Sequence, residues 1–289
     1  MEILTIILAC LTSLGSGAGI ILDKIAEAKI SSQVIGIEEQ AVRIDNQPNY
    51  NVAKGKLSRV RIANRGVRLK PGIRIAAIDL ETDPLSVKPS ELKLSSIDSL
   101  RESLNAPATG AVKIVINETD LNQALQSPEI QQQLQDNLNR LIARRAGSNN
   151  ISYNLTDVRL ELRPQNRLVA SFKLDRPRPS LSSTLNSTQA GTYRASNRSR
   201  ELAISLELTL KVIDGQMVRL VDPQGTVNGS PMSSRLLNGF ATGISDRLNL
   251  NALEQDGILA RILQLEINED NLQLVGFVRL ETKQPESSD

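Results

Sequence analysis

Two acidic clusters are the residues of this chain whose type and spacing come closest to a site with chemistry. Glu118 and Asp120 form one cluster, and Glu266, Glu269 and Asp270 form the other. Several carboxylate oxygens together could hold Ca²⁺, but neither cluster has the spacing of a calcium-binding loop. Such side chains more often cap helices or occupy solvated turns. We therefore predict no metal site, and we expect both clusters at the ends of strands or helices.

Histidine is absent from all 289 residues, and Cys10 is the only cysteine. This composition excludes a Ser-His triad, a histidine zinc site, an internal disulfide and a cysteine-based metal site. The GxxxxGK[ST], GxGxxG and GxSxG motifs are also missing. We predict that the protein is not an enzyme and needs no cofactor. A hydrolase that uses only carboxylates is the alternative.

The composition favours an apolar ligand. Hydrophobic residues make up 40% of the chain but aromatic residues only 2%, so the core must consist of Leu, Ile and Val. Sites for sugars and single-stranded nucleic acids rely on aromatic faces. The 34 basic and 32 acidic residues are interspersed, and the net charge of +2 creates no field that would attract nucleic acid. We therefore expect no nucleic-acid partner, whereas acyl chains suit aliphatic walls.

An uncharged apolar segment runs from Ile3 to Leu22. It has the length of a membrane-crossing helix, but the Ser and Gly residues of its second half also suit the end of a signal peptide. We expect residues 1–22 to be a signal peptide or membrane anchor of undecided cleavage and orientation. Residues 23–289 would then form one domain associated with a membrane, facing the periplasm or envelope. Ile7-Leu8-Ala9-Cys10 loosely matches a lipoprotein cleavage site, but the large Leu8 favours Cys10 as an ordinary apolar residue.

Strand patterns dominate the chain after the leader. Alternating apolar and polar residues predict antiparallel strands at 42–44, 57–62, 73–75, 78–81, 112–116, 151–162, 168–174, 202–212, 217–221, 262–267 and 272–280. Helical spacing predicts four helices. One continues the leader to about Ile37, a short one ends at Leu125, one begins at Pro128, and the last extends over 231–248. The expected fold class is α+β.

Apolar stripes on the two longer helices supply our candidate lipid-binding residues. They are Ile130, Leu134, Leu138 and Leu141 on the first helix, and Leu236, Leu237, Phe240 and Ile244 on the second. Gly239 and Gly243 lie one turn apart on the second helix, which predicts a close approach to another backbone. The alternative is a contact face for lipid tails.

Two further segments have distinctive compositions. Residues 175–200 are rich in Ser, Thr, Pro and Arg, and we expect a flexible solvated insertion, with contact to anionic lipid headgroups as the alternative. The segments 116–121 and 267–272 echo each other as INETDL and INEDNL. Similar polar turns at two strand ends explain this echo better than a duplication.

The chain resembles the LmeA-like phospholipid-binding proteins of bacterial envelopes, in particular their cyanobacterial members. The resemblance covers nearly the whole chain except residues 175–200. It is carried by ILDKIAEAKI, VRIDNQPNYNVAKGKLSRVRIANRGVRL, RIAAIDLETDPLSV, INETDLNQALQSP and the segment from VNGSPMSS to LVGFVRLE. The resemblance implies a fold similar to tubular, BPI-like lipid-binding domains, in which a curved antiparallel sheet wraps one or two long helices and leaves an apolar groove. It implies no catalytic residues.

These observations predict a non-enzymatic, membrane-associated envelope protein that binds the acyl chains of phospholipid or another lipid. Transport or presentation of the lipid is a further expectation, and the N-terminus would contact the membrane. The alternative is a scaffolding envelope domain with a closed core and a protein partner of unknown identity.

Overall fold

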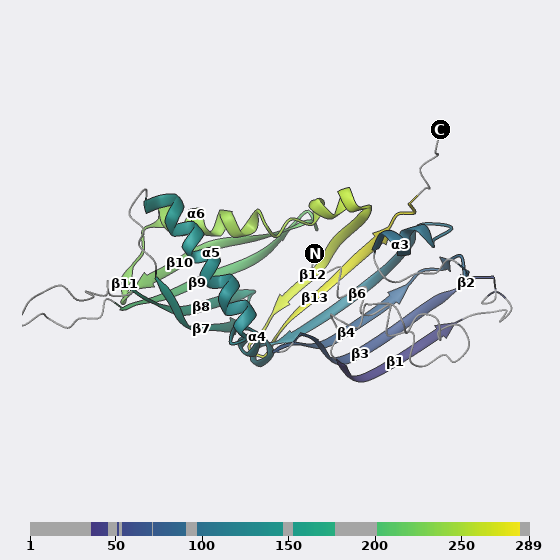
Figure 1. The fold of residues 1–289 in the computed structure, drawn as a ribbon, viewed down its shortest axis with the longest axis horizontal. Helices are drawn as coiled ribbons and strands as arrows, with labels where there is room; N and C mark the ends of the chain where they lie inside the picture. The colour runs from purple at the N-terminus through teal and green to yellow at the C-terminus, as the bar shows by residue number, and fades with distance from the viewer. Residues whose placement is uncertain are drawn as a thin grey trace, which may run out of the picture.

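Antiparallel strands form most of the described structure. The computed structural model describes residues 36–45, 51, 54–70, 72–90, 97–146, 153–176 and 201–283. Their strands form a six-stranded sheet, a five-stranded sheet and one short pair, and all pairs of neighbouring strands are antiparallel. The antiparallel α+β prediction is confirmed, but the strands divide between two larger sheets (Figure 1).

The six-stranded sheet joins the first and last described parts of the chain. Its order is β1 (Gly36–Asp45), β3 (Arg59–Lys70), β4 (Ile73–Thr82), β6 (Ala108–Asn117), β13 (Asn271–Leu280) and β12 (Ile258–Ile267). Register places Val42, Ile62, Leu80 and Val112 side by side on one face. The short strands β2 (Lys56–Leu57) and β5 (Leu85–Ser86) add Leu57 and Leu85 to this core, and α3 (Ile97–Glu102) follows β5.

The five-stranded sheet is a meander inserted between β6 and β12. Its order is β7 (Asn154–Arg163), β8 (Arg167–Asp175), β9 (Glu201–Ile213), β10 (Met217–Val227) and β11 (Ser230–Pro231). One face is polar and carries ion pairs between neighbouring strands, such as Arg167–Glu207 at 3.0 Å and Lys173–Glu201 at 3.1 Å. The other face is apolar, as the alternation predicts.

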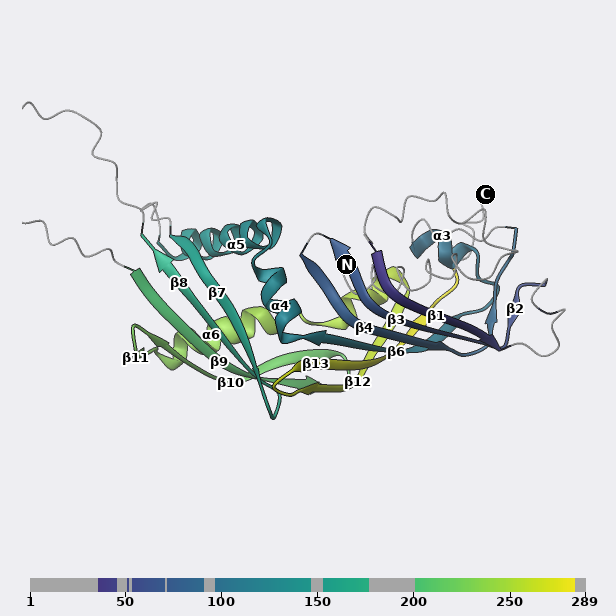
Figure 2. The same cartoon turned by 90° about the horizontal axis from the view of Figure 1, so that it is seen from below.

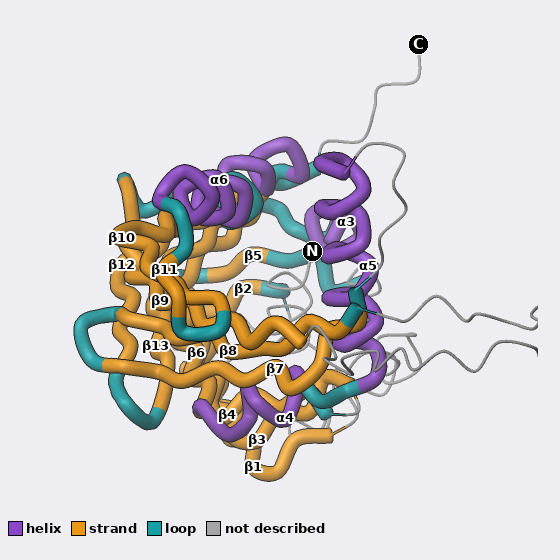
Figure 3. Tube along the Cα trace, turned by 90° about the vertical axis from the view of Figure 1, so that its left-hand side faces the viewer, coloured by secondary structure: helices purple, strands orange, loops and turns teal. Residues whose placement is uncertain are grey.

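Three of the described helices lie at the edges of the five-stranded sheet. Two of them, α4 (Glu118–Leu125) and α5 (Pro128–Ala146), follow β6 and run beside the β7 edge (Figure 2). The helix α6 (Ser234–Ser245) packs on β10, and a 3₁₀ helix, η3 (Leu250–Asp256), packs on β12. Figure 3 shows α6 above β10 and β9 and α5 beside the end of β7. A sheet wrapped around a long helix is therefore not confirmed.

Turn residues of the five-stranded sheet bind the outer edge of β12. The side chain of Asn166, in the β7–β8 turn, donates to the Leu265 carbonyl at 3.2 Å and accepts from the Ile267 N–H at 2.8 Å. Asn166 has a φ of 59°, which asparagine tolerates better than most residues. The carbonyl of Gly215, in the β9–β10 turn, accepts from the Ile262 N–H at 2.6 Å. These bonds connect the two sheets through backbone groups that would otherwise lack partners.

Several predicted segments lie outside the described residues. These are the leader with its helical continuation up to residue 35, and residues 177–200 of the expected insertion. The expected helix is wrong at Ile37, because this residue lies in β1. Asp175 ends β8. Among the helices that the structure describes, none combines the length and the apolar character needed to cross a membrane.

Candidate functional site

One face of the five-stranded sheet is built almost entirely from aliphatic side chains, and we call it the aliphatic face. Register and alternation place uncharged residues on it from four strands: Leu155, Val158, Leu160, Leu162, Leu168, Ala170, Phe172, Leu174, Leu202, Ile204, Leu206, Leu208, Leu210, Val212, Val218 and Leu220. Part of this face is buried, with Leu162 only 2% exposed. Leu155, Phe172 and Ile204 are only half-buried. The described structure thus leaves apolar surface partly open here.

The helix α6 covers the β10 side of the aliphatic face. Ala241 packs with Leu208 and Leu220 in one buried cluster. Beneath the helix, a Cβ atom at Gly225 would lie 2.7 Å from Leu206 Cδ2 and 2.9 Å from Leu237 Cδ2. Glycine at this strand position therefore allows the helix to sit directly on the sheet.

A serine fixes which flank of α6 meets the edge of the sheet. The Ser245 hydroxyl accepts from the Leu220 N–H at 2.9 Å and donates to the Ala241 carbonyl at 2.8 Å. Phe240 and Ile244 pack against the Leu208–Leu220 cluster. The polar flank of the helix thus lies at the β10 edge, and its apolar flank is directed across the sheet.

On the opposite edge, polar side chains of α4 take the place of a strand. Glu118, Asn122 and Gln126 are four residues apart, so they lie on one side of the helical segment. Glu118 accepts from the Leu162 N–H at 2.8 Å. Asn122 accepts from the Leu160 N–H and donates to its carbonyl, both at 2.8 Å, and Gln126 donates to the Val158 carbonyl at 3.0 Å.

The spacing of this polar ladder follows from elementary geometry. Four helical residues advance ~6 Å along the axis. Two strand residues advance ~6.7 Å, so every fourth helical side chain can meet every second residue of β7. Gln135 of α5 continues the contacts, accepting from the Leu155 N–H at 2.8 Å and donating to the Tyr153 carbonyl at 2.5 Å. The helices therefore satisfy the free edge of β7 without adding a strand.

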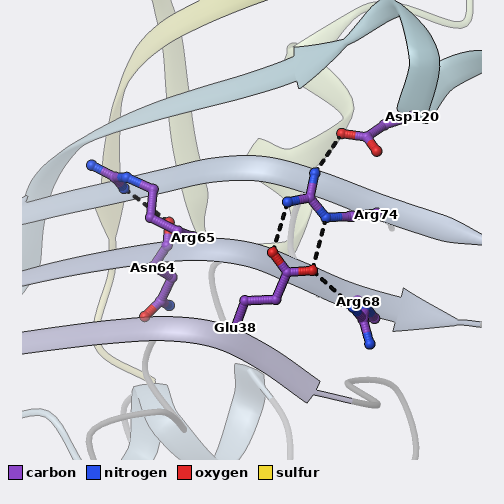
Figure 4. A network of polar contacts seen from close by, with 6 residues as sticks. All are labelled: Glu38, Asn64, Arg65, Arg68, Arg74 and Asp120. Atoms are coloured by element: carbon purple, nitrogen blue, oxygen red, sulfur yellow. Dashed lines mark hydrogen bonds and ion pairs between the residues drawn. The ribbon is translucent and has the colours of Figure 1, made fainter.

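A network of charges fastens α4 to the six-stranded sheet (Figure 4). Asp120, only 6% exposed, accepts from Arg74 at 2.9 Å. Arg74 also donates to both carboxylate oxygens of Glu38, which accepts from Arg68 at 2.8 Å as well. Hydrogen bonds from Arg74 and Arg68 lower the pKa of Glu38 to about 2, and the Glu38 carboxylate in turn raises the pKa of Arg74. This network holds elements together and contains no poised acid or base.

A concave feature lies on the six-stranded sheet. It has a volume of about 410 Å³ and is lined by residues 41–43, 61–63, 79–81, 111–113 and Val275. Ile62, Leu80 and Val112 are buried in the core, so alternation leaves small side chains such as Ala63 on its open wall. Charged residues surround this wall, including the Arg61–Glu81 pair at 3.3 Å. It offers less aliphatic surface than the aliphatic face does.

The structure places the predicted lipid-binding residues in different environments. Ile130, Leu134 and Leu138 are half-buried on α5, and the side chain of Leu141 lies outside the described part. On α6, Leu237 is 5% exposed and Leu236 is 40% exposed. Phe240 and Ile244 meet the aliphatic face. These candidate residues all lie on helices, whereas the aliphatic face also includes β9, in which every second residue of 202–212 is apolar.

One packing prediction for α6 is wrong. A Cβ atom at Gly243 would have no described neighbour within 4 Å, so this glycine permits no close backbone approach. Gly239 is exposed. The glycine that does permit a close approach is Gly225, on the strand beneath the helix.

The acidic clusters take structural roles. No group of three or more Asp, Glu, His or Cys residues within the described ranges could hold a metal ion. The two echoing segments lie side by side, because Asn117 pairs with Asn271 and the Glu118 N–H donates to the Asp270 carbonyl at 2.9 Å. Asn268 accepts from the Asp270 N–H at 2.9 Å, as expected for a polar turn.

Comparison with known proteins identifies a relationship over most of the chain. The model of a family described as LmeA-like phospholipid-binding matches residues 14–277. Neither the curated proteins nor the solved structures contain a match. The match runs from before β1 into β13 and includes the polar ladder and α6.

Proposed function

Because the chain belongs to the LmeA-like phospholipid-binding family, we propose that it binds the acyl chains of a phospholipid on the aliphatic face, without catalysing a reaction. The observation that carries this proposal is the half-buried state of Leu155, Phe172 and Ile204 on a face without charged residues. Apolar surface that a folded domain leaves partly uncovered can mark a binding site. Here it lies on the sheet between the edges that α5 and α6 occupy.

The energetics favour an acyl chain over a polar ligand. Removing a CH₂ group from water stabilises the bound state by ~0.8 kcal/mol. A chain with about ten buried CH₂ groups would gain roughly 8 kcal/mol before the cost of association is subtracted. An aliphatic wall provides this gain without placed hydrogen-bonding groups. The phospholipid headgroup would remain outside, because no charged side chain belongs to the aliphatic face.

The attachment of α5 suits reversible binding. Described contacts of α5 with β7 include the Gln135 bonds, and the apolar residues Ile130, Leu134 and Leu138 are only half-buried. Movement of this helix away from β7 would break the two Gln135 hydrogen bonds. We propose that lipid enters and leaves beside α5, as transport or presentation requires. Association with a membrane through residues 1–22, on the envelope side, belongs to the same proposal.

Native mass spectrometry of the full chain, released from detergent in the spectrometer, tests the proposal. We expect mass adducts of phospholipid, retained after exchange into a detergent that carries no lipid. Ile204→Asp places a charge on the aliphatic face and should abolish them. Ala203→Asp is the matched control, because Ala203 is exposed on the opposite face of the same strand beside Lys173. A protein without adducts, also after incubation with vesicles, would favour a scaffolding domain instead.

A further inference from the structure

Exposed leucines gather at α6. Among the described residues, the large hydrophobic side chains classed as exposed are Ile44 at 37%, Leu236 at 40%, Leu248 at 40% and Leu263 at 65%. Leu236 lies in the first turn of α6, and Leu248 lies just beyond its last residue, Ser245. Two of the four exposed side chains therefore lie at the ends of one helix.

One flank of α6 presents apolar residues and a glycine. Successive helical residues are rotated by ~100°, so Leu236, Phe240 and Gly243 lie on the side away from the polar flank of Asn238 and Thr242. Ser245 places that polar flank at the β10 edge. A Cβ atom at Gly243 would meet open space. The Leu236 flank thus continues the aliphatic face outward to the surface of the molecule.

Basic residues accompany the exposed leucines. Arg235 precedes Leu236, and Arg247 precedes Leu248. The structure gives neither arginine an ion pair with a described residue. The helix contains no acidic residue, and Asp246 is the one acidic residue of 234–248. An arginine beside an exposed leucine suits a bilayer surface, since the guanidinium binds lipid phosphate while the apolar side chain enters the acyl boundary.

We propose that α6 and its C-terminal extension, residues 234–248, are the surface with which the protein docks on a phospholipid bilayer. This proposal rests on the proposed function, because docking would bring the aliphatic face to its source of lipid. A chain leaving the bilayer would pass Leu236 and Phe240 before it reaches Leu208 and Leu220. The surface is distinct from residues 1–22, which would only tether the protein.

Site-directed fluorescence on the full chain tests this assignment. In a Cys10→Ser background, single cysteines at positions 236, 248, 263 and 44 are labelled with a polarity-sensitive dye. The protein is then reconstituted with phosphatidylcholine–phosphatidylglycerol vesicles. Labels at 236 and 248 should be quenched by nitroxide-bearing lipids and protected from iodide in water. Labels at 263 and 44 should show the reverse. Quenching at 263 or 44 without quenching at 236 and 248 would overturn the proposal.

An acidic substitution separates docking from lipid binding. Leu248→Asp should slow lipid uptake from vesicles by about tenfold, because an apolar contact with the bilayer is replaced by a charge. The amount of lipid bound at equilibrium should be unchanged, whereas Ile204→Asp should reduce that amount. Leu263→Asp is the control for an exposed leucine elsewhere and should leave uptake unaltered. Unchanged uptake in Leu248→Asp would contradict docking through α6 and its extension, even if lipid is still bound.

Discussion

The two large sheets contain the same types of aliphatic residue but bury them to different extents. In the six-stranded sheet, Ile62 is 2% and Ile78 is 0% exposed, and other strands supply further residues to the same core. In the five-stranded sheet, α6 buries Leu208 and Leu220, while Ile204 on the same face is only half-buried. The core of the six-stranded sheet is therefore closed over β3, β4 and β6, although Ile44 at its β1 edge is 37% exposed. The five-stranded sheet instead has half-buried apolar side chains in the middle of its aliphatic face.

This difference indicates that alternation alone does not determine what a sheet face does. The pattern of Val60 and Ile62 in β3 resembles that of Leu202 and Ile204 in β9. What differs is the covering layer, which comes from distant parts of the chain. A face that is completely covered provides stability, and one that is partly covered can accept a ligand. We expect substitutions in the two sheets to separate stability from lipid binding.

The largest expected contrast is between Ile78→Ala and Ile204→Ala. Ile78→Ala leaves a cavity in the closed core and should lower the free energy of unfolding by ~2–5 kcal/mol. Ile204→Ala, at a half-buried site, should cost about 1 kcal/mol or less but weaken lipid retention by about tenfold. Urea unfolding measures the first quantity and native mass spectrometry the second. Equal losses of stability in both variants would show that the aliphatic face is a closed core as well.

The polar ladder should contribute the next largest effect. Asn122→Leu removes both bonds to Leu160 and leaves its backbone groups without side-chain partners, which should cost ~1–3 kcal/mol. Gln123→Leu is the control, because its exposed side chain on the same helix is adjacent to the ladder but outside it. Hydrogen exchange at the β7 amides provides a local readout. Protection that is equal in both variants would contradict the replacement of a strand by α4.

The polar ladder also shows how far the sequence could be interpreted. Period-two patterns correctly predict the antiparallel strands, and the Ser-Pro pair at 127–128 correctly predicts the start of α5. These signals are local. The partners of Glu118 and Asn122 lie on β7, and no local sequence pattern indicates which residue of β7 each side chain contacts. The sequence also could not predict that the aliphatic face is only half-buried, because covered and uncovered leucines follow the same alternating pattern.

Two glycines of the five-stranded sheet region should respond in opposite directions. Gly243→Ala adds a methyl group in open space on α6 and improves helix propensity, so it should stabilise the protein by ~0.5–1 kcal/mol. Gly225→Ala places a Cβ atom 2.7 Å from Leu206 and should destabilise the protein and loosen α6. Thermal unfolding distinguishes the two. Stabilisation by both variants would mean that α6 does not sit directly on the sheet.

The smallest expected effect concerns the pH response of the six-stranded sheet. Bonds to Arg74 and Arg68 lower the pKa of Glu38 to about 2 from its ordinary value of 4.5. The group binds fewer protons when folded, so its contribution to stability is complete above about pH 4.5 and is lost as the pH falls toward 2. Because Glu38 is largely accessible to solvent, screening keeps this contribution small.

Comparison of the wild type with Glu38→Gln isolates that contribution. Urea is the suitable denaturant, because guanidinium ions would screen the Glu38–Arg74 pair. The stability difference between the two proteins should be greatest near pH 6 and should shrink by pH 3, while lipid retention at pH 6 stays equal. A difference that does not change with pH would mean that Glu38 acts by packing. A change in lipid retention would instead link the charge network, through Asp120 and α4, to the aliphatic face.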